Sequence, residues 1–306
     1  MPGTIDVHHH LIPARFTELW FASIEKARGL QLPKWLEEGT LNAIGEVGLG
    51  TAIVSLGHPV HPYVKDPAQI GPVCREINEY TAKFRDARPD KIGFFATLPP
   101  LDQPETCLAE IAYGLDVLGA DGVVVFSSYA AKYLGHGDFR PIWSELNRRG
   151  AVVLVHPGFE GMAPIEEPRL LAAPIVDWTH ETTRTAVHLI TTDTMRDFSD
   201  VNIVLSHAGG TLPYVINRAA NLCCRLRIAG RDKKTEQEFV EEARRFYIDV
   251  AFSGHEPQLR LLREFAAPGH EHADVMKVQL AATDAVFAKE TRLAGLKLFP
   301  RLAKYQ

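Results

Sequence analysis

Seven short apolar runs alternate with longer segments of helical pattern, and this alternation constrains the fold of the 306-residue chain most strongly. The runs are almost continuously apolar and rich in β-branched residues, which is typical of strands covered on both faces. The predicted strands are Ile5–His8, Thr51–Leu56, Ile92–Thr97, Gly122–Ser127, Ala151–His156, Val201–His207 and Phe246–Val250. The predicted helices are Pro67–Ala87, Pro104–Leu118, Phe139–Arg149, Thr182–Asp193 and Lys234–Arg245. This α/β pattern predicts a parallel sheet, and its regular spacing favours a closed TIM-type (β/α)8 barrel.

Nothing in the composition divides the chain into parts. No flexible linker interrupts the sequence, so we expect residues 1–306 to form a single barrel domain. Two long connections, Pro13–Ala43 and Phe159–Thr179, follow the first and fifth predicted strands. In a barrel both would lie at the C-terminal ends of the strands, which is the face where barrel enzymes build their active sites.

Charge and cysteine content exclude several classes of protein. The net charge is −5 and no run of Lys or Arg is present, so we expect no nucleic-acid partner. No apolar stretch approaches the roughly 18 residues of a membrane span, and the first residues lack the pattern of a secretory signal. The four cysteines contain no CxxC pair and are interpreted as reduced thiols of a cytoplasmic protein: Cys74, Cys107, Cys223 and Cys224.

Histidines mark the first strand and the ends of two later ones. His8 and His10 are two residues apart, so both side chains lie on the same side of the strand. His156 ends the run that starts at Ala151, and His207 ends the run that starts at Val201. Imidazole nitrogens commonly bind Zn²⁺, and a catalytic zinc site uses about three protein ligands with one open position. The alternative interpretation is that His156 and His207 only form local hydrogen bonds, but the complete set favours a metal site.

Several motifs together resemble a known enzyme family. They are Asp6–Pro13, Arg148–Pro157 within Gly122–Gly158, Glu181–Arg184 and Ser206–Gly210. They resemble the aminocarboxymuconate-semialdehyde decarboxylase branch of the amidohydrolase superfamily. The resemblance extends in order over about residues 4–270, and within this branch it is closest to the fungal 6-methylsalicylate decarboxylases.

The resemblance implies a mononuclear metal enzyme. It matches His8, His10 and His156 to the metal ligands, and His207 to the catalytic histidine that handles a water or a proton beside the metal. It implies one divalent ion, Zn²⁺ or, as in some members, Mn²⁺, and the strand Gly122–Ser127 contains no lysine that could bridge two metals. It also implies a homodimer that removes CO₂ from a small aromatic acid and releases a phenol, in polyketide secondary metabolism.

Three residues are candidates for binding the substrate. Arg184 is placed to clamp an anion, or else to pair with Glu181 one turn earlier in the same helix. Trp178 and Phe159 are candidate walls for a planar ring, or else pack in the ordinary way.

The sequence departs from the family pattern after residue 270. The family takes its last metal ligand, an aspartate, from the eighth strand. Here Val275–Thr283 is either a substitute strand that ends in the ligand Asp284, or part of a helix, in which case the strand and its aspartate are missing. The richness in Ala, Lys, Glu and Leu favours the helix. We therefore expect an eighth strand that is missing or altered.

Two other functions remain open at this point. The same scaffold supports a metal-dependent hydrolase in which an activated water attacks a lactone or amide carbonyl. A chain without the last carboxylate could also be a truncated, inactive paralogue, which would bind no metal.

Overall fold

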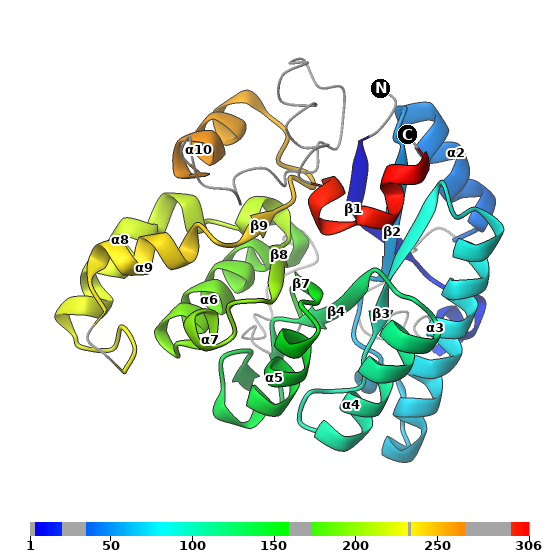
Figure 1. Cartoon of the computed structure of the whole chain (residues 1–306), viewed down its shortest axis with the longest axis horizontal. Helices are drawn as coiled ribbons and strands as arrows, with labels where there is room; N and C mark the ends of the chain where they lie inside the picture. Colours follow the sequence, from blue (N-terminus) through cyan, green and yellow to red (C-terminus); the bar gives the residue numbers. More distant parts are fainter. Residues whose placement is uncertain (1–3, 20–34, 159–172, 232–233, 267–294, 306) are drawn as a thin grey trace.

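The chain forms one curled parallel sheet of seven strands with helices around it (Figure 1). The computed structural model describes residues 4–19, 35–158, 173–231, 234–266 and 295–305. The sheet order is β1-β2-β3-β4-β7-β8-β9, so strands that follow one another in the chain are also neighbours in space. The strand bounds are β1 (Ile5–Leu11), β2 (Thr51–Leu56), β3 (Ile92–Thr97), β4 (Gly122–Phe126), β7 (Val152–His156), β8 (Asn202–Leu205) and β9 (Tyr247–Ile248). The predicted TIM-type α/β fold is confirmed.

The outer layer consists of helices, and the five predicted helical segments are all present. The helices are α2 (Glu37–Val47), α3 (Ile70–Ala87), α4 (Pro104–Ala112), α5 (Arg140–Arg148), α6 (Asp177–Thr191), α7 (Thr194–Asp197), α8 (Leu212–Arg225), α9 (Glu236–Ala243) and α10 (Glu256–Ala266). Tyr113–Val117 continues α4 as a π-helical turn, and a short hairpin, β5 (Ser128–Tyr129) and β6 (Lys132–Tyr133), follows β4.

The prediction of a long connection over Pro13–Ala43 was partly wrong. Residues 14–19 are helical, and α2 begins at Glu37. Two acidic residues lie in the first turn of α2, where they oppose the helix dipole, and its buried residues Thr40 and Ile44 are four apart, on one face. Gly48 ends the helix in the left-handed conformation, with φ of 70°, that glycine adopts without strain.

The strands are apolar throughout because both of their faces are covered. Every residue of β2, β3, β4 and β7 is buried. At Gly122, a Cβ atom would lie 2.2 Å from the carbonyl oxygen of Val152, so only glycine allows β4 and β7 to approach so closely at this point. This packing places the C-terminal ends of the strands at one face of the sheet.

The described strands do not include an eighth. Within the described ranges, β1 and β9 are the two outer strands of the sheet. Residues 267–294, and with them the predicted Asp284, lie outside the described residues. None of the described helices is both long enough and apolar enough to cross a membrane.

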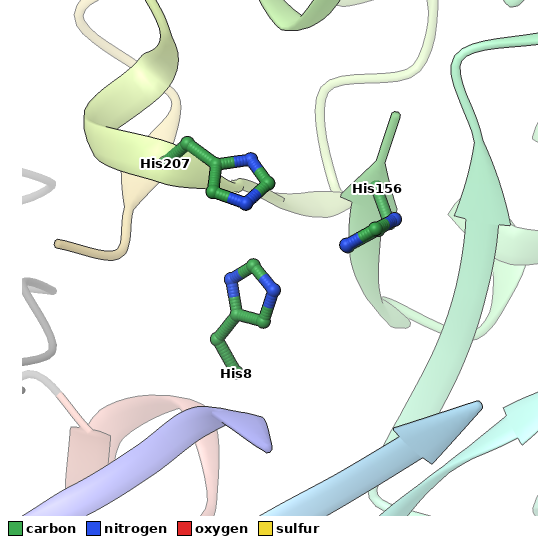
Figure 2. Close-up of side chains that lie close together, drawn as sticks. All are labelled: His8, His156 and His207. Carbon is green, nitrogen blue, oxygen red and sulfur yellow. The ribbon is translucent and has the colours of Figure 1, made fainter. Parts of the chain in front are cut away.

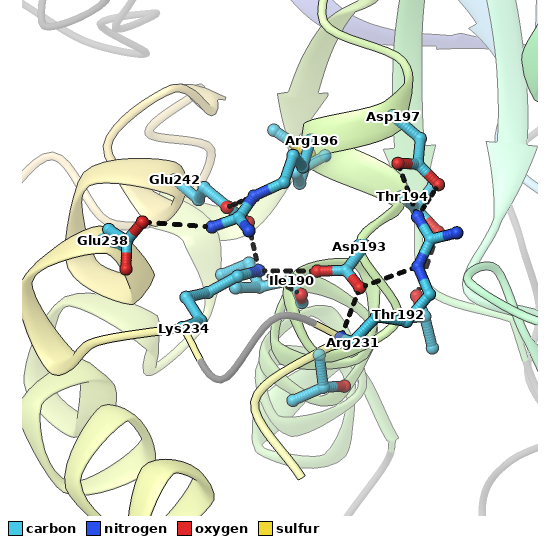
Figure 3. A network of polar contacts seen from close by, with 12 residues as sticks. Ile190, Thr192, Asp193, Thr194, Arg196, Asp197, Arg231, Lys234, Glu238 and Glu242 are labelled. Atoms are coloured by element: carbon cyan, nitrogen blue, oxygen red, sulfur yellow. Dashed lines mark hydrogen bonds and ion pairs between the residues drawn. The ribbon is translucent and has the colours of Figure 1, made fainter. Parts of the chain in front are cut away.

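A buried ionic network ties α9 to the turn between α6 and α7 (Figure 3). The fully buried Lys234 ammonium donates to Glu242 Oε2 at 2.6 Å and to the Ile190 carbonyl at 2.7 Å, and it lies 3.3 Å from Asp193 Oδ1. Arg231 binds the same Asp193 carboxylate from the more exposed side, through its main-chain N–H and its guanidinium. The network therefore satisfies charges that would be costly to bury alone.

We expect Lys234→Met to destabilise the protein by about 3–5 kcal/mol, because the change leaves buried carboxylates without their shared cation. The measurement is the shift in the midpoint of urea unfolding. Lys132→Met is the matched control: Lys132 pairs with Asp138 at the surface, and such pairs contribute about 1 kcal/mol or less. Equal effects of the two changes would contradict the prediction.

Candidate metal centre

β1 directs His8 and His10 to the same point. The Nε2 atoms of the two rings are 3.1 Å apart, which confirms that the side chains share one side of the strand. His9 faces away and contacts Asp6 and Thr40. The pairing of β1 with β2 shifts register between Asp6 and His9, and the Asp6 carboxylate accepts the His8 main-chain N–H at 2.9 Å within this irregularity.

His10 lies against the end of β2. A Cβ atom added to Gly57, just after this strand, would lie 2.9 Å from His10 Cγ. Glycine at position 57 therefore leaves room for the His10 ring, and a larger residue would push it out of place.

His156 and His207 complete the cluster from β7 and from the segment after β8. The ring centroid of His8 lies 5.2 Å from that of His156 and 4.9 Å from that of His207. The His10 ring lies 4.9 Å from the His156 ring. His8, His156 and His207 can each offer one ring nitrogen, and these nitrogens lie within 4.8 Å of one another (Figure 2). The sheet therefore brings together all four histidines that the sequence singled out.

One ring nitrogen of His156 carries no proton. Its Nδ1 is 3.0 Å from the Pro157 carbonyl oxygen, which can only accept, so Nδ1 carries the proton and Nε2 is bare. Nε2 is buried and has no hydrogen-bond partner among the described residues. Burial, followed by the neighbouring imidazoles of His10 and His8, holds the pKa of His156 well below its ordinary value. A neutral imidazole with a bare, buried Nε2 suits a metal ion, and the cluster fits one divalent ion.

Asp249 belongs to the same centre, although it was not among the site residues predicted from the sequence. It follows β9 and is fully buried. Its Oδ2 lies 2.8 Å from His8 Nδ1, and its Oδ1 accepts the main-chain N–H groups of His207 and Ala251 at 3.0 and 2.9 Å. The available signal was a carboxylate near the end of a predicted buried strand, Phe246–Val250, at the face where the histidines gather.

Of the three predicted substrate residues, Trp178 and Arg184 lie in different surroundings. Trp178, in the first turn of α6, has its ring 5.3 Å from that of His156 and 5.7 Å from that of His207. Arg184 is exposed, and its hydrogen bond to the Tyr133 hydroxyl raises its pKa. The Tyr133 hydroxyl in turn donates to Glu181 at 3.3 Å. Described contacts thus bring Trp178 to the histidines, whereas Arg184 is linked only to Tyr133, through its pKa. Phe159 lies outside the described residues.

Sequence comparison identifies relatives over nearly the whole chain. The decarboxylase macB of Penicillium terrestre is 43% identical over 278 residues, which are 87% of this chain and 81% of that protein. The 6-methylsalicylic acid decarboxylase acuB of Aspergillus aculeatus is 38% identical, over 98% of this chain and 97% of that protein. The 6-methylsalicylic acid decarboxylase of Penicillium expansum is 37% identical, over 97% of this chain and 96% of that protein.

Solved structures share the fold. A 2,6-dihydroxybenzoate decarboxylase in complex with 2,6-dihydroxybenzoate has a TM-score of 0.75 at 20% identity, covering 98% of this chain and all of that one. A 5-carboxyvanillate decarboxylase of Novosphingobium aromaticivorans, in complex with manganese, has a TM-score of 0.78 at 20% identity, covering 99% of this chain and 93% of that one. The sequence profile of the amidohydrolase family matches residues 5–270. With this match and the histidine cluster on the same sheet, the chain belongs to the amidohydrolase family.

Proposed function

We propose that the chain is a metal-dependent decarboxylase that removes CO₂ from a small aromatic acid of the 6-methylsalicylate type and leaves the corresponding phenol. The observation that carries the proposal is the four-histidine cluster, in which His8, His156 and His207 are buried and the Nε2 of His156 is bare. The relatives that extend over 97–98% of this chain are named as 6-methylsalicylic acid decarboxylases, which supports this class of substrate.

In this proposal His8, His10 and His156 hold the ion, which is Zn²⁺ or Mn²⁺. Two nitrogens that bind the same ion, each at about 2.1 Å, lie about 3 to 3.4 Å apart. The Nε2 atoms of His8 and His10 are 3.1 Å apart, which supports their assignment as ligands of one ion. An ion held there would supply a Lewis acid and a template for an aromatic acid.

His207 handles the proton. The ring carbon that bears the carboxylate must gain a proton before the bond to CO₂ breaks and its electrons return to the ring. The His207 ring lies beside the other imidazoles and beside Trp178, so its N–H, or a water held by it, can deliver this proton to a ring placed against Trp178. Trp178 would then be a wall of the substrate site. Arg184 remains a predicted anion clamp.

The test is an assay of the purified chain with 6-methylsalicylate, with detection of CO₂ and of the phenol. We expect one metal ion per chain by elemental analysis, activity that is lost on chelation, and recovery with Mn²⁺ or Zn²⁺. Ring opening of an aryl lactone without release of CO₂ would favour the hydrolase instead. Purified protein with neither metal nor activity would indicate the truncated paralogue.

Other features remain predictions from the sequence. They are a single domain over residues 1–306, a homodimer, a cytoplasmic location and a place in polyketide secondary metabolism. Separation by size with light scattering tests the dimer directly.

A further inference from the structure

The Asp249 carboxylate joins three separate parts of the site. It follows β9, and its Oδ2 reaches His8 on β1 at 2.8 Å, although β9 and β1 are the two outer strands among those described. Its Oδ1 accepts the main-chain N–H of His207, after β8, at 3.0 Å. The side chain is fully buried, so solvent does not weaken these contacts.

The contact with His8 determines where a neutral His8 carries its proton. A carboxylate can only accept hydrogen bonds, so His8 Nδ1 must be the donor and the proton must be on Nδ1. This leaves Nε2, the atom that lies 3.1 Å from His10 Nε2, without a proton. Carboxylates commonly fix metal-binding histidines in this way.

The contact with His207 holds an unusual stretch of backbone. His207 and Ala208 have φ angles of 55° and 59°, in the left-handed region that residues other than glycine rarely adopt. Asp249 binds both residues: Oδ1 accepts the His207 N–H, and the Asp249 main-chain oxygen accepts the Ala208 N–H at 2.9 Å. This conformation directs the His207 ring toward His8 (Figure 2).

We propose that Asp249 is a positioning residue that keeps the proton of neutral His8 on Nδ1, so that Nε2 can bind a metal ion, and that it also holds the backbone of His207. The inference rests on the proposed function in one respect: the metal-binding role of His8 is the one proposed above. Asp249 itself is assigned no contact with the ion.

Asp249→Asn separates this role from simple packing, because the two side chains have nearly the same shape. Oδ1 faces two main-chain donors, His207 N–H and Ala251 N–H, and neither of them can accept. The amide oxygen of an asparagine would therefore stay on that side, and its NH₂ would face His8. His8 Nδ1 would have to accept, which moves the proton of the neutral ring to Nε2.

The first experiment uses the metal-free full-length protein labelled with ¹⁵N-histidine. The ¹⁵N shifts of the wild type should show His8 protonated on Nδ1, and those of Asp249→Asn should show it protonated on Nε2. If wild-type His8 carries its proton on Nε2, or if the variant keeps it on Nδ1, the proposal is overturned. The wild-type spectrum alone decides the tautomer even if the variant fails to fold.

The second experiment measures Mn²⁺ affinity by titration. Loss of a partner of this kind typically weakens metal binding 10–100-fold, and we expect that range for Asp249→Asn. Asp193→Asn is the matched control, because Asp193 is also buried and accepts a main-chain N–H, but from Arg231 in the network of Figure 3. Its Mn²⁺ affinity should equal that of the wild type. Unchanged affinity in Asp249→Asn overturns the proposal, whereas a wild type that binds no metal but has the Nδ1 proton overturns the proposed function alone.

Discussion

Replacing His156 with alanine is expected to remove the bound metal and the release of CO₂ together. Its bare Nε2 is buried among three other imidazoles, and no other described residue offers it a hydrogen bond. Loss of a residue that hydrogen-bonds to a metal ligand already lowers metal affinity 10–100-fold. Loss of a ligand itself should therefore lower metal affinity by more than about 100-fold. Elemental analysis after gel filtration measures the metal, and the CO₂ assay measures the activity.

His188→Ala is the matched control for this change. Burial lowers the pKa of His188, as it does that of His156, although His188 is only partly buried. His188 lies on α6 and accepts the Gly135 N–H rather than facing the cluster. Its alanine variant should lose some stability and keep its metal. A His156→Ala protein that retains one tightly bound ion per chain would contradict the proposed ligand set.

His207→Asn is expected to lower kcat by about 10²–10⁴-fold while the metal content stays at that of the wild type. The range is that of a lost general acid or base. Asparagine is chosen because the backbone at position 207 has φ of 55°, a conformation that asparagine tolerates better than most residues. Its amide cannot deliver a proton at neutral pH.

The metal content decides between two roles for His207. Its ring nitrogen lies within 4.8 Å of those of His8 and His156, so the geometry also places it within reach of a shared ion. If His207→Asn loses metal as readily as His156→Ala does, His207 is a ligand and the proton comes from another group. His10→Ala is expected to lose the metal whichever role His207 has, because Nε2 of His10 lies 3.1 Å from Nε2 of His8.

Most of the strands could be predicted from the sequence, for a simple physical reason. A strand with helices on one side and barrel side chains on the other has no polar face, and such runs are conspicuous in β2, β3, β4 and β7. The predicted helices did not include α2, α7, α8 or α10. In α8 the buried residues Leu212, Ile216, Ala220 and Cys223 recur every three or four positions among both polar and apolar neighbours, so its apolar face is less conspicuous in the sequence than a continuous apolar strand.

The four histidines could be predicted because local rules determine their positions. Residues two apart on a strand share one side, and the ends of parallel strands meet at one face, so His8, His10, His156 and His207 had to converge if the fold was correct. Asp249 could not be recognised in this way. Its partner His8 is 241 residues away, and no local pattern shows that the two side chains touch.

The sequence by itself determined the parallel α/β architecture and the convergence of four imidazoles, because apolar runs and strand ends are local properties of the chain. Only the tertiary structure decided which ring nitrogens face one another and that Trp178 lies beside the cluster. It also decided that Asp249 holds both His8 and the backbone of His207. Those relations depend on the curvature of the sheet. It brings β9 and β1, the two outer strands among those described, close enough for the Asp249 carboxylate to lie 2.8 Å from His8 Nδ1.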